Sequence, residues 1–202
     1  MDFCTLLFVL ICVFFFVFLV VRSTFGGKKT RTSLNSGPIR LLLVLGSGGH
    51  TAELLSIVRS LDLERKFDAT FVIGHEDELS EKKLKASGLL YSKTLRVQRA
   101  RRVGQAYASS VWTTMITLFQ ALLFCYQIRP QLLICNGPAT CIPVCLAARL
   151  FGAETIFVES FCRTKSLSLS GKIACRICDH VIVQWPYMTS LQPELKYIGL
   201  LV

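Results

Sequence analysis

A glycine-rich segment carries the clearest chemistry in the sequence. Its residues are Gly46, Ser47, Gly48, Gly49, His50 and Thr51, and they separate an apolar run from a helical pattern. Glycines after a parallel strand let the backbone turn tightly and approach a ligand, and the next helix offers unpaired N–H groups to an anion. We therefore expect this glycine loop to bind phosphate or pyrophosphate. His50 could orient an acceptor, take a proton from a hydroxyl, or only cap the helix.

The same loop excludes one nucleotide-binding motif and weakens another. A Walker loop requires Gly-Lys-Ser or Gly-Lys-Thr, which this segment lacks, so a P-loop NTPase is excluded. Gly46 and Gly48 fit the start of a Gly-x-Gly-x-x-Gly dinucleotide fingerprint, but Thr51 occupies the place of the third glycine. A nucleotide-binding membrane oxidoreductase remains an alternative, and it predicts that the isolated domain binds NAD(P).

Polar residues also follow two later apolar runs. Asn136 and Gly137 come after residues 131–135, and Glu159 comes after residues 155–158. Because ligands bind at the carboxyl ends of parallel strands, we expect these residues at the same sheet edge as the glycine loop. Asn136 can donate to and accept from a sugar or phosphate, or it can belong to a plain turn. Glu159 is a candidate catalytic base or acceptor contact, or a structural carboxylate.

The elements that position these residues alternate along the chain. Short runs rich in Val, Ile and Leu separated by helical patterns indicate βαβ units and a parallel sheet covered on both faces. The predicted fold is α/β, a single Rossmann-like lobe over residues 39–202. Strands are predicted at 40–45, 70–73, 95–97, 131–135, 155–158 and 180–183, and helices at 51–61, 78–87, 107–128, 142–151 and 170–178.

The amino-terminal part has a different composition. Residues 3–21 are uncharged and mostly apolar, and a bilayer core of about 30 Å needs about 20 helical residues, so we predict one transmembrane helix. A cleaved signal peptide fits less well, because no basic side chain precedes the run. Basic residues follow it, whereas only Asp2 precedes it, which places the carboxyl-terminal domain in the cytosol. Residues 22–38 are predicted to form a basic linker rich in Gly and Ser.

Residues 106–128 form a second long uncharged run. Hydroxyl and amide side chains interrupt it, and its apolar residues recur at helical spacing. It could be a core helix, a helix with its apolar face in the membrane interface, or a second span. A second span would place the later strands across the membrane from strand 40–45 and would destroy the sheet.

The overall charge indicates an anionic partner. The chain has a formal net charge of +10, 52% hydrophobic residues and 18% charged residues, and these proportions exclude a disordered chain. A dense basic run could meet lipid headgroups or an acceptor pyrophosphate, and these fit a membrane-tethered domain better than nucleic acid does. It could also be a solvated loop. The run contains Arg96, Arg99, Arg101 and Arg102.

The cysteines do not indicate a metal site. The chain has nine cysteines, an odd number in a domain of ordinary size, so a reducing compartment and buried thiols are the simpler interpretation. Cys175 and Cys178 lack a second pair at zinc-finger spacing. We therefore predict neither a metal nor a cofactor. Ser170, Gly171 and Lys172 could bind phosphate, although a plain helix start is the simpler interpretation.

Six segments, in order, resemble the membrane-anchor subunit of the split UDP-N-acetylglucosamine transferase that adds the second sugar to dolichyl-pyrophosphate-GlcNAc. Ala139 departs from that pattern, where a second glycine is expected, and this affects only local backbone freedom. The matching segments are 46–51 with Glu53, then 135–143, 158–160, 167–172, 181–186 and 197–199.

The resemblance implies the amino-terminal, acceptor-side lobe of a GT-B glycosyltransferase in protein N-glycosylation. It implies that a soluble, donor-binding subunit is recruited to the cytosolic face of the endoplasmic reticulum, and that the chain alone has little activity. A pure membrane scaffold is the alternative. The apolar chain end would be either a buried last strand or the segment that binds the partner subunit; its residues are Tyr197, Ile198, Gly199, Leu200, Leu201 and Val202.

Overall fold

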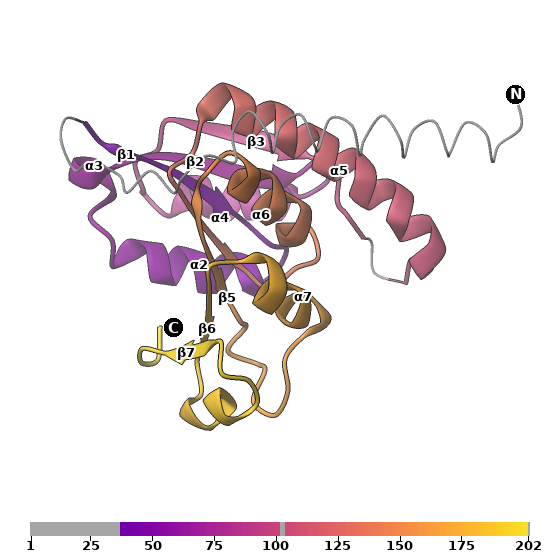
Figure 1. Cartoon of the computed structure of the whole chain (residues 1–202). Helices are drawn as coiled ribbons and strands as arrows, with labels where there is room; N and C mark the ends of the chain where they lie inside the picture. The colour runs from indigo at the N-terminus through magenta and orange to yellow at the C-terminus, as the bar shows by residue number, and fades with distance from the viewer. Residues whose placement is uncertain (1–36, 102–103, 202) are drawn as a thin grey trace, which may run out of the picture.

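Seven parallel strands form one sheet in the order β3-β2-β1-β4-β5-β6-β7 (Figure 1). The computed structural model describes residues 37–101 and 104–201, so the predicted transmembrane helix 3–21 and nearly all of the linker 22–38 lie outside the described residues. The strands are β1 (Ile39–Val44), β2 (Phe67–Gly74), β3 (Lys93–Val97), β4 (Leu132–Asn136), β5 (Glu154–Val158), β6 (His180–Val183) and β7 (Leu195–Tyr197).

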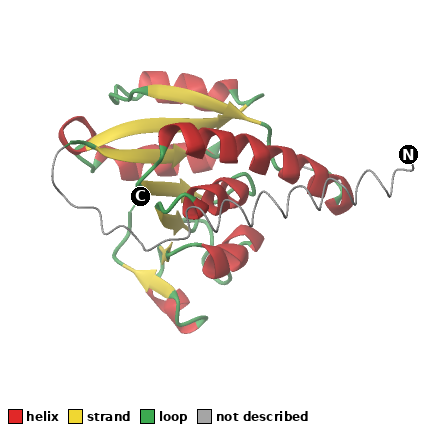
Figure 2. Ribbon diagram, turned by 45° about the horizontal axis from the view of Figure 1, so that its top comes forward, coloured by secondary structure: helices red, strands yellow, loops and turns green. Residues whose placement is uncertain are grey.

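Helices cover both faces of the sheet (Figure 2). One apolar core lies between the sheet and α2 (Gly49–Arg59), α3 (Leu63–Lys66) and α4 (Glu78–Ala86). The other core lies between the sheet and α5 (Tyr107–Ile128), α6 (Cys141–Leu150) and α7 (Leu169–Ile177). A 3₁₀ helix, η1 (Pro186–Ser190), precedes the last strand.

The central strand β1 explains why the sheet needs two helical layers. Leu41 and Leu43 point into the core on the α2 side, whereas Leu42 and Val44 point into the core on the α6 side. All four side chains are at most 1% exposed. A strand buried on both faces has a continuous apolar sequence instead of an alternating one, and this is typical of parallel sheets.

The predicted fold class is confirmed, and the six predicted strands and five predicted helices are present. Three short elements were not predicted: α3, η1 and the edge strand β7. Of the three residues in β7, only Leu195 is buried, so its sequence has no apolar run to indicate a strand.

The inner side of α5 is mixed, with hydroxyls against the protein in its first half and apolar residues such as Ala121 and Cys125 in the core in its second half. Thr113 donates to the carbonyl of Ala100 at 2.6 Å, and Thr117 donates to the carbonyl of Gln98 at 2.7 Å. Apolar residues on the outer surface of α5 are exposed, and we call them the outer face of α5. They are Val111, Trp112, Ile116, Phe119, Leu123 and Tyr126.

The position of α5 excludes one of the three predicted alternatives. Residues Ala108–Ile128 are long and apolar enough to cross a membrane by length and composition. However, α5 connects β3 to β4, and both strands belong to the same sheet, so α5 is not a second membrane span. Its amino-terminal end projects beyond the sheet in both views (Figures 1 and 2).

The chain order around β1 creates a crevice. From β1 the chain continues to β2 on one side, whereas β4 pairs with the other side of β1. In open α/β sheets, the carboxyl ends of two such strands form the usual ligand site, because the connections on the two sides diverge there. The glycine loop follows β1, and Asn136 ends β4, so both lie at this point.

Candidate functional site

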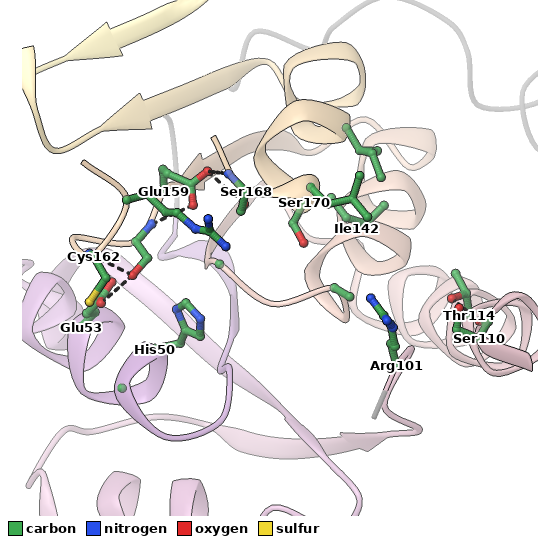
Figure 3. A pocket seen from close by; sticks show the side chains of 17 residues that line it. His50, Glu53, Arg101, Ser110, Thr114, Ile142, Glu159, Cys162, Ser168 and Ser170 are labelled. Atoms are coloured by element: carbon green, nitrogen blue, oxygen red, sulfur yellow. Dashed lines mark hydrogen bonds between the residues drawn. The ribbon is translucent and has the colours of Figure 1, made fainter. Parts of the chain in front are cut away.

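A cavity of about 730 Å³ lies at this edge of the sheet (Figure 3). His50 in the first turn of α2 and Gly137 after β4 form part of one wall. Glu159 after β5 and Ser170 in α7 form another, and Thr114 of α5 faces them from the opposite side. The cavity therefore joins segments that are far apart in the sequence.

The glycine loop forms a sharp turn into α2. Gly48 has φ +67°, a left-handed conformation that favours glycine, and it precedes α2 without a side-chain cap. At Gly46, a Cβ atom would lie 2.6 Å from the Cβ of His50, so only glycine fits there. Gly49 and His50, which begin α2, line the cavity. This is the arrangement that binds anions at helix N-termini.

Side chains of α2 and α4 hold the glycine loop in place. The Thr51 hydroxyl donates to the carbonyl of Gly46, and the Ser80 hydroxyl donates to the same carbonyl at 3.0 Å. Lys83 of α4 donates to the carbonyl of Gly48 at 3.1 Å. Thr51 is fully buried, so its hydroxyl supports the loop from the protein interior. The ligand contact predicted for Thr51 stays a prediction.

His50 and Asn136 lie side by side, as the shared sheet edge led us to expect. His50 Nδ1 is 2.8 Å from Asn136 Oδ1. Gly137 has φ +75°, and a Cβ atom there would lie 2.3 Å from both Cε1 and Nδ1 of the His50 ring. The loop after β4 therefore packs directly on the imidazole and needs glycine for two separate reasons. Within residues 37–101 and 104–201, no group hydrogen-bonds His50 Nε2.

Glu53 is a site residue to which the sequence analysis assigned no role. It lies one helical turn after His50, is 8% exposed and accepts a hydrogen bond from Asn136 Nδ2 at 2.9 Å. It also accepts from the Ser160 hydroxyl at 2.8 Å and from the Phe161 N–H at 3.3 Å. The available signal was its spacing of three residues from His50, which places both side chains on one helix face.

Glu159 is fully buried and has three hydrogen-bond donors around its carboxylate. Oε1 accepts from the Ser160 N–H at 3.0 Å, and Oε2 accepts from the N–H and the hydroxyl of Ser168 at 2.9 and 3.0 Å. A Cβ atom at Gly171 would lie 2.2 Å from Oε2. These contacts tie the start of α7 to the end of β5. The catalytic role predicted for Glu159 stays a prediction, beside this structural role.

Two arginines supply positive charge to the cavity. Arg101 and Arg163 both line it, and Figure 3 shows Arg101 and His50 on opposite sides. The predicted basic run is divided, because Arg96 pairs with Glu81 and Arg99 lies 3.5 Å from Asp77, whereas Arg102 is outside the described residues. Arg163 lies outside that run, and no pattern in the sequence indicated it.

The chain end lies outside the cavity. Ile198 and Leu200 are 64% and 55% exposed, whereas Leu201 packs against the core on the α2 side. The Leu201 N–H donates to Gln184 Oε1 at 3.3 Å, and Val202 is outside the described residues. The tail is therefore held at Leu201 while exposing apolar residues before it. Tyr187 of η1, Leu191 directly after η1 and Tyr197 of β7 are also exposed.

The described cysteines are free thiols, and most are buried. Burial raises the pKa of the Cys125 thiol to about 12, and burial also raises the pKa of Cys135. Such thiols stay protonated and pack as small apolar side chains. Among the described residues, no group of three or more potential metal ligands occurs.

The family comparison covers nearly all of the described chain, and a mouse and a human relative share one name. The family model described as "Oligosaccharide biosynthesis protein Alg14 like" matches residues 41–201. The "UDP-N-acetylglucosamine transferase subunit ALG14" of Mus musculus is 39% identical over 182 residues, covering 81% of this chain and 83% of the mouse protein. The protein of that name from Homo sapiens is 35% identical over 181 residues, covering 81% and 83%.

Solved structures show the same fold in larger proteins. Acinetobacter baumannii MurG superposes with a TM-score of 0.59 at 15% identity, covering 74% of this chain and 42% of MurG. A UDP-GlcNAc 2-epimerase from Neisseria meningitidis, solved with UDP-GlcNAc bound, gives a TM-score of 0.56 at 12% identity, covering 72% and 40%. This chain therefore spans less than half the length of either solved structure.

Proposed function

This chain belongs to the Alg14-like family of oligosaccharide biosynthesis proteins, and from that premise we propose that it is the membrane-anchored, acceptor-side subunit of a heteromeric UDP-N-acetylglucosamine transferase. The acceptor is dolichyl-pyrophosphate-GlcNAc, and the product carries the second GlcNAc of the lipid-linked oligosaccharide used in protein N-glycosylation. A separate soluble subunit supplies the UDP-GlcNAc site. The match of residues 41–201 to the family carries this proposal.

The chemistry follows from the residues around the cavity. The glycine loop and the start of α2 bind the acceptor pyrophosphate, and Arg101 and Arg163 neutralise further negative charge. His50 Nε2 removes the proton from the acceptor hydroxyl as the hydroxyl oxygen attacks C1 of the donor sugar. The bond from C1 to UDP breaks with inversion, and UDP leaves with the electron pair.

The position at the membrane follows from two features. Residues 3–21 anchor the chain in the membrane of the endoplasmic reticulum, with the described domain in the cytosol. The outer face of α5 rests in the membrane interface, since it is apolar and carries no charged residue. Ser110 and Thr114 of the same helix line the cavity, so this placement brings the cavity mouth to the lipid acceptor.

Reconstitution of the full chain in liposomes tests the proposal. Transfer of GlcNAc from UDP-GlcNAc to the lipid acceptor is measured for this chain, for a soluble donor-lobe subunit, and for both together. We expect transfer only with both. Full-rate transfer by this chain alone would refute the division of labour, and NAD(P) binding by the chain would instead favour the oxidoreductase alternative.

Variants in the same assay separate catalysis from anchoring. His50→Ala should lower the rate by about 100-fold or more while the partner stays bound, because a general base is lost. An unchanged rate would favour a pure scaffold. Ile198→Asp together with Leu200→Asp should abolish co-purification of the partner. Leu90→Asp is the control, since Leu90 is 62% exposed but lies before β3, at the other edge of the sheet.

A further inference from the structure

Two hydrogen bonds connect Glu53 to His50 through Asn136. The Glu53 carboxylate accepts from Asn136 Nδ2 at 2.9 Å, and Asn136 Oδ1 lies 2.8 Å from His50 Nδ1. Glu53 and Asn136 are both buried, and Asn136 has no exposed surface. The link is therefore shielded from water, where a hydrogen bond has a fixed partner and a fixed direction.

The chemistry of a carboxylate sets the direction of each bond. An ionised carboxylate can only accept, so the NH₂ group of Asn136 must face Glu53. Its carbonyl oxygen must then face His50, and that oxygen can only accept. Hence His50 Nδ1 must carry the hydrogen. The orientation of an Asn side chain is often ambiguous, but here Glu53 determines it.

This direction decides which ring nitrogen faces the cavity as a base. A neutral imidazole has one N–H, and with the hydrogen on Nδ1 the lone pair is on Nε2. Within the described residues, Nε2 has no hydrogen-bond partner, and His50 lines the cavity. When Nε2 takes a proton, the Nδ1–H bond to Asn136 persists and stabilises the positive ring.

We propose that Glu53 is a positioning residue that acts through Asn136 to hold His50 in the tautomer with hydrogen on Nδ1, leaving Nε2 free to accept the proton of the acceptor hydroxyl. This inference rests on the proposed function for the identity of the proton donor. The tautomer itself does not depend on it. Without the Glu53 contact, Asn136 can rotate and present its NH₂ group to Nδ1, which moves the hydrogen to Nε2 and removes the base.

A simpler role for Glu53 is to anchor the segment after β5, since it also binds Ser160 and Phe161. Three variants separate the two roles. Glu53→Leu removes every contact. Ser160→Ala removes a contact to that segment and leaves the bond to Asn136. Glu53→Gln can keep its carbonyl oxygen toward Asn136 and Phe161 while its NH₂ group donates to the Ser160 hydroxyl.

The ¹⁵N chemical shifts of the His50 ring in the full chain report the tautomer directly. We expect hydrogen on Nδ1 in the unmodified chain, in Ser160→Ala and in Glu53→Gln, and a shift of the hydrogen toward Nε2 in Glu53→Leu. Hydrogen on Nε2 in the unmodified chain would overturn the proposal, as would an unchanged tautomer in Glu53→Leu. If Glu53→Leu does not fold, Asn136→Ala removes the link alone and must shift the tautomer in the same way.

Activity of the assembled complex gives a second measurement. Glu53→Leu should lower kcat by about 10-fold or more with little change in KM for the acceptor, whereas Glu53→Gln should restore kcat. Equal losses of kcat in Glu53→Leu and Ser160→Ala would leave Glu53 only the role of anchoring the segment after β5. If no transferase activity is found in any preparation, the proposed function fails, while the ring spectra still decide the tautomer.

Discussion

Helices α2 and α5 cover opposite faces of the sheet and differ in how they place their apolar side chains. In α2, Leu54 and Val58 are fully buried and the polar residue His50 faces the cavity. In α5, Thr117 is fully buried, whereas Phe119 is 55% exposed. Among the described residues, no buried polar side-chain atom lacks a hydrogen-bond partner. The chain thus satisfies its polar groups internally but leaves the apolar outer face of α5 to be covered from outside.

The difference indicates what each helix is for. The apolar side of helix α2 is packed within the chain, and His50 Nδ1 and the Glu53 carboxylate have hydrogen-bond partners. Helix α5 carries an exposed apolar stripe larger than isolated surface residues produce, and such stripes mark contacts with lipid or protein. A change near α2 should therefore affect chemistry, whereas a change on the outer face of α5 should affect placement at the membrane.

The largest effect is expected at Gly137, beside the start of α2. Gly137→Ala adds a Cβ atom 2.3 Å from the His50 ring, so the ring must leave its position against Asn136. The rate of GlcNAc transfer by the assembled complex should fall by about 100-fold or more.

Gly152→Ala is the matched control for Gly137→Ala. Gly152 has φ +84°, close to the +75° of Gly137, but nothing lies within 4 Å of an added Cβ atom. Both variants should lose about 1 to 3 kcal/mol of stability from backbone strain, measured by thermal unfolding. Only Gly137→Ala should lose activity. Equal activities would show that the ring position does not matter and that α2 is merely structural.

A second test concerns the outer face of α5 and has a smaller effect. The chain has two tryptophans, Trp112 on that face and Trp185, whose Nε1 donates to the carbonyl of Phe161 at 2.8 Å. In a Trp185→Phe chain reconstituted in liposomes, brominated lipids should quench Trp112 fluorescence by about half or more, because its ring reaches the acyl boundary. The Trp112→Phe chain should show much weaker quenching of Trp185. Equal quenching in both chains would mean that the outer face of α5 is not in the membrane.

Much of this fold follows from apolar runs in the sequence, because strands such as β1 are buried on both faces. The buried face of α5 did not follow. Its hydroxyls bind carbonyl groups of residues 98–100, an irregular segment, and periodicity in a helix contains no information about such a partner. The glycine loop and Asn136 were identified from their positions after strands. Glu53 was not identified, since its partners Asn136 and Ser160 are 83 and 107 residues away in the chain. Arg163 was not identified either, since only the folded chain shows that it lines the cavity.

The smallest effect is expected at the buried hydroxyl of Thr117, on the inner side of α5. Thr117→Val keeps the shape of the side chain but removes the hydroxyl that donates to the carbonyl of Gln98 at 2.7 Å. Because the partly buried carbonyl of Gln98 then loses this donor, the free energy of unfolding should fall by about 1 to 2 kcal/mol. On the exposed side of the helix, Ser109→Ala removes a hydroxyl that donates to the carbonyl of Ala106, the residue before α5, and it should cost less than about 0.5 kcal/mol.

Comparing the loss of stability in Thr117→Val with the loss in Phe119→Ser decides which side of α5 faces the core. If the apolar stripe that contains Phe119 faced the core, Phe119→Ser would cost about 3 kcal/mol or more, and Thr117→Val would be neutral. The structure predicts the reverse order in detergent solution, because Phe119 is exposed and Thr117 is not. Urea unfolding of the three variants measures the order directly. A greater loss for Phe119→Ser than for Thr117→Val would place the apolar stripe in the protein core and contradict the proposed contact of α5 with the membrane.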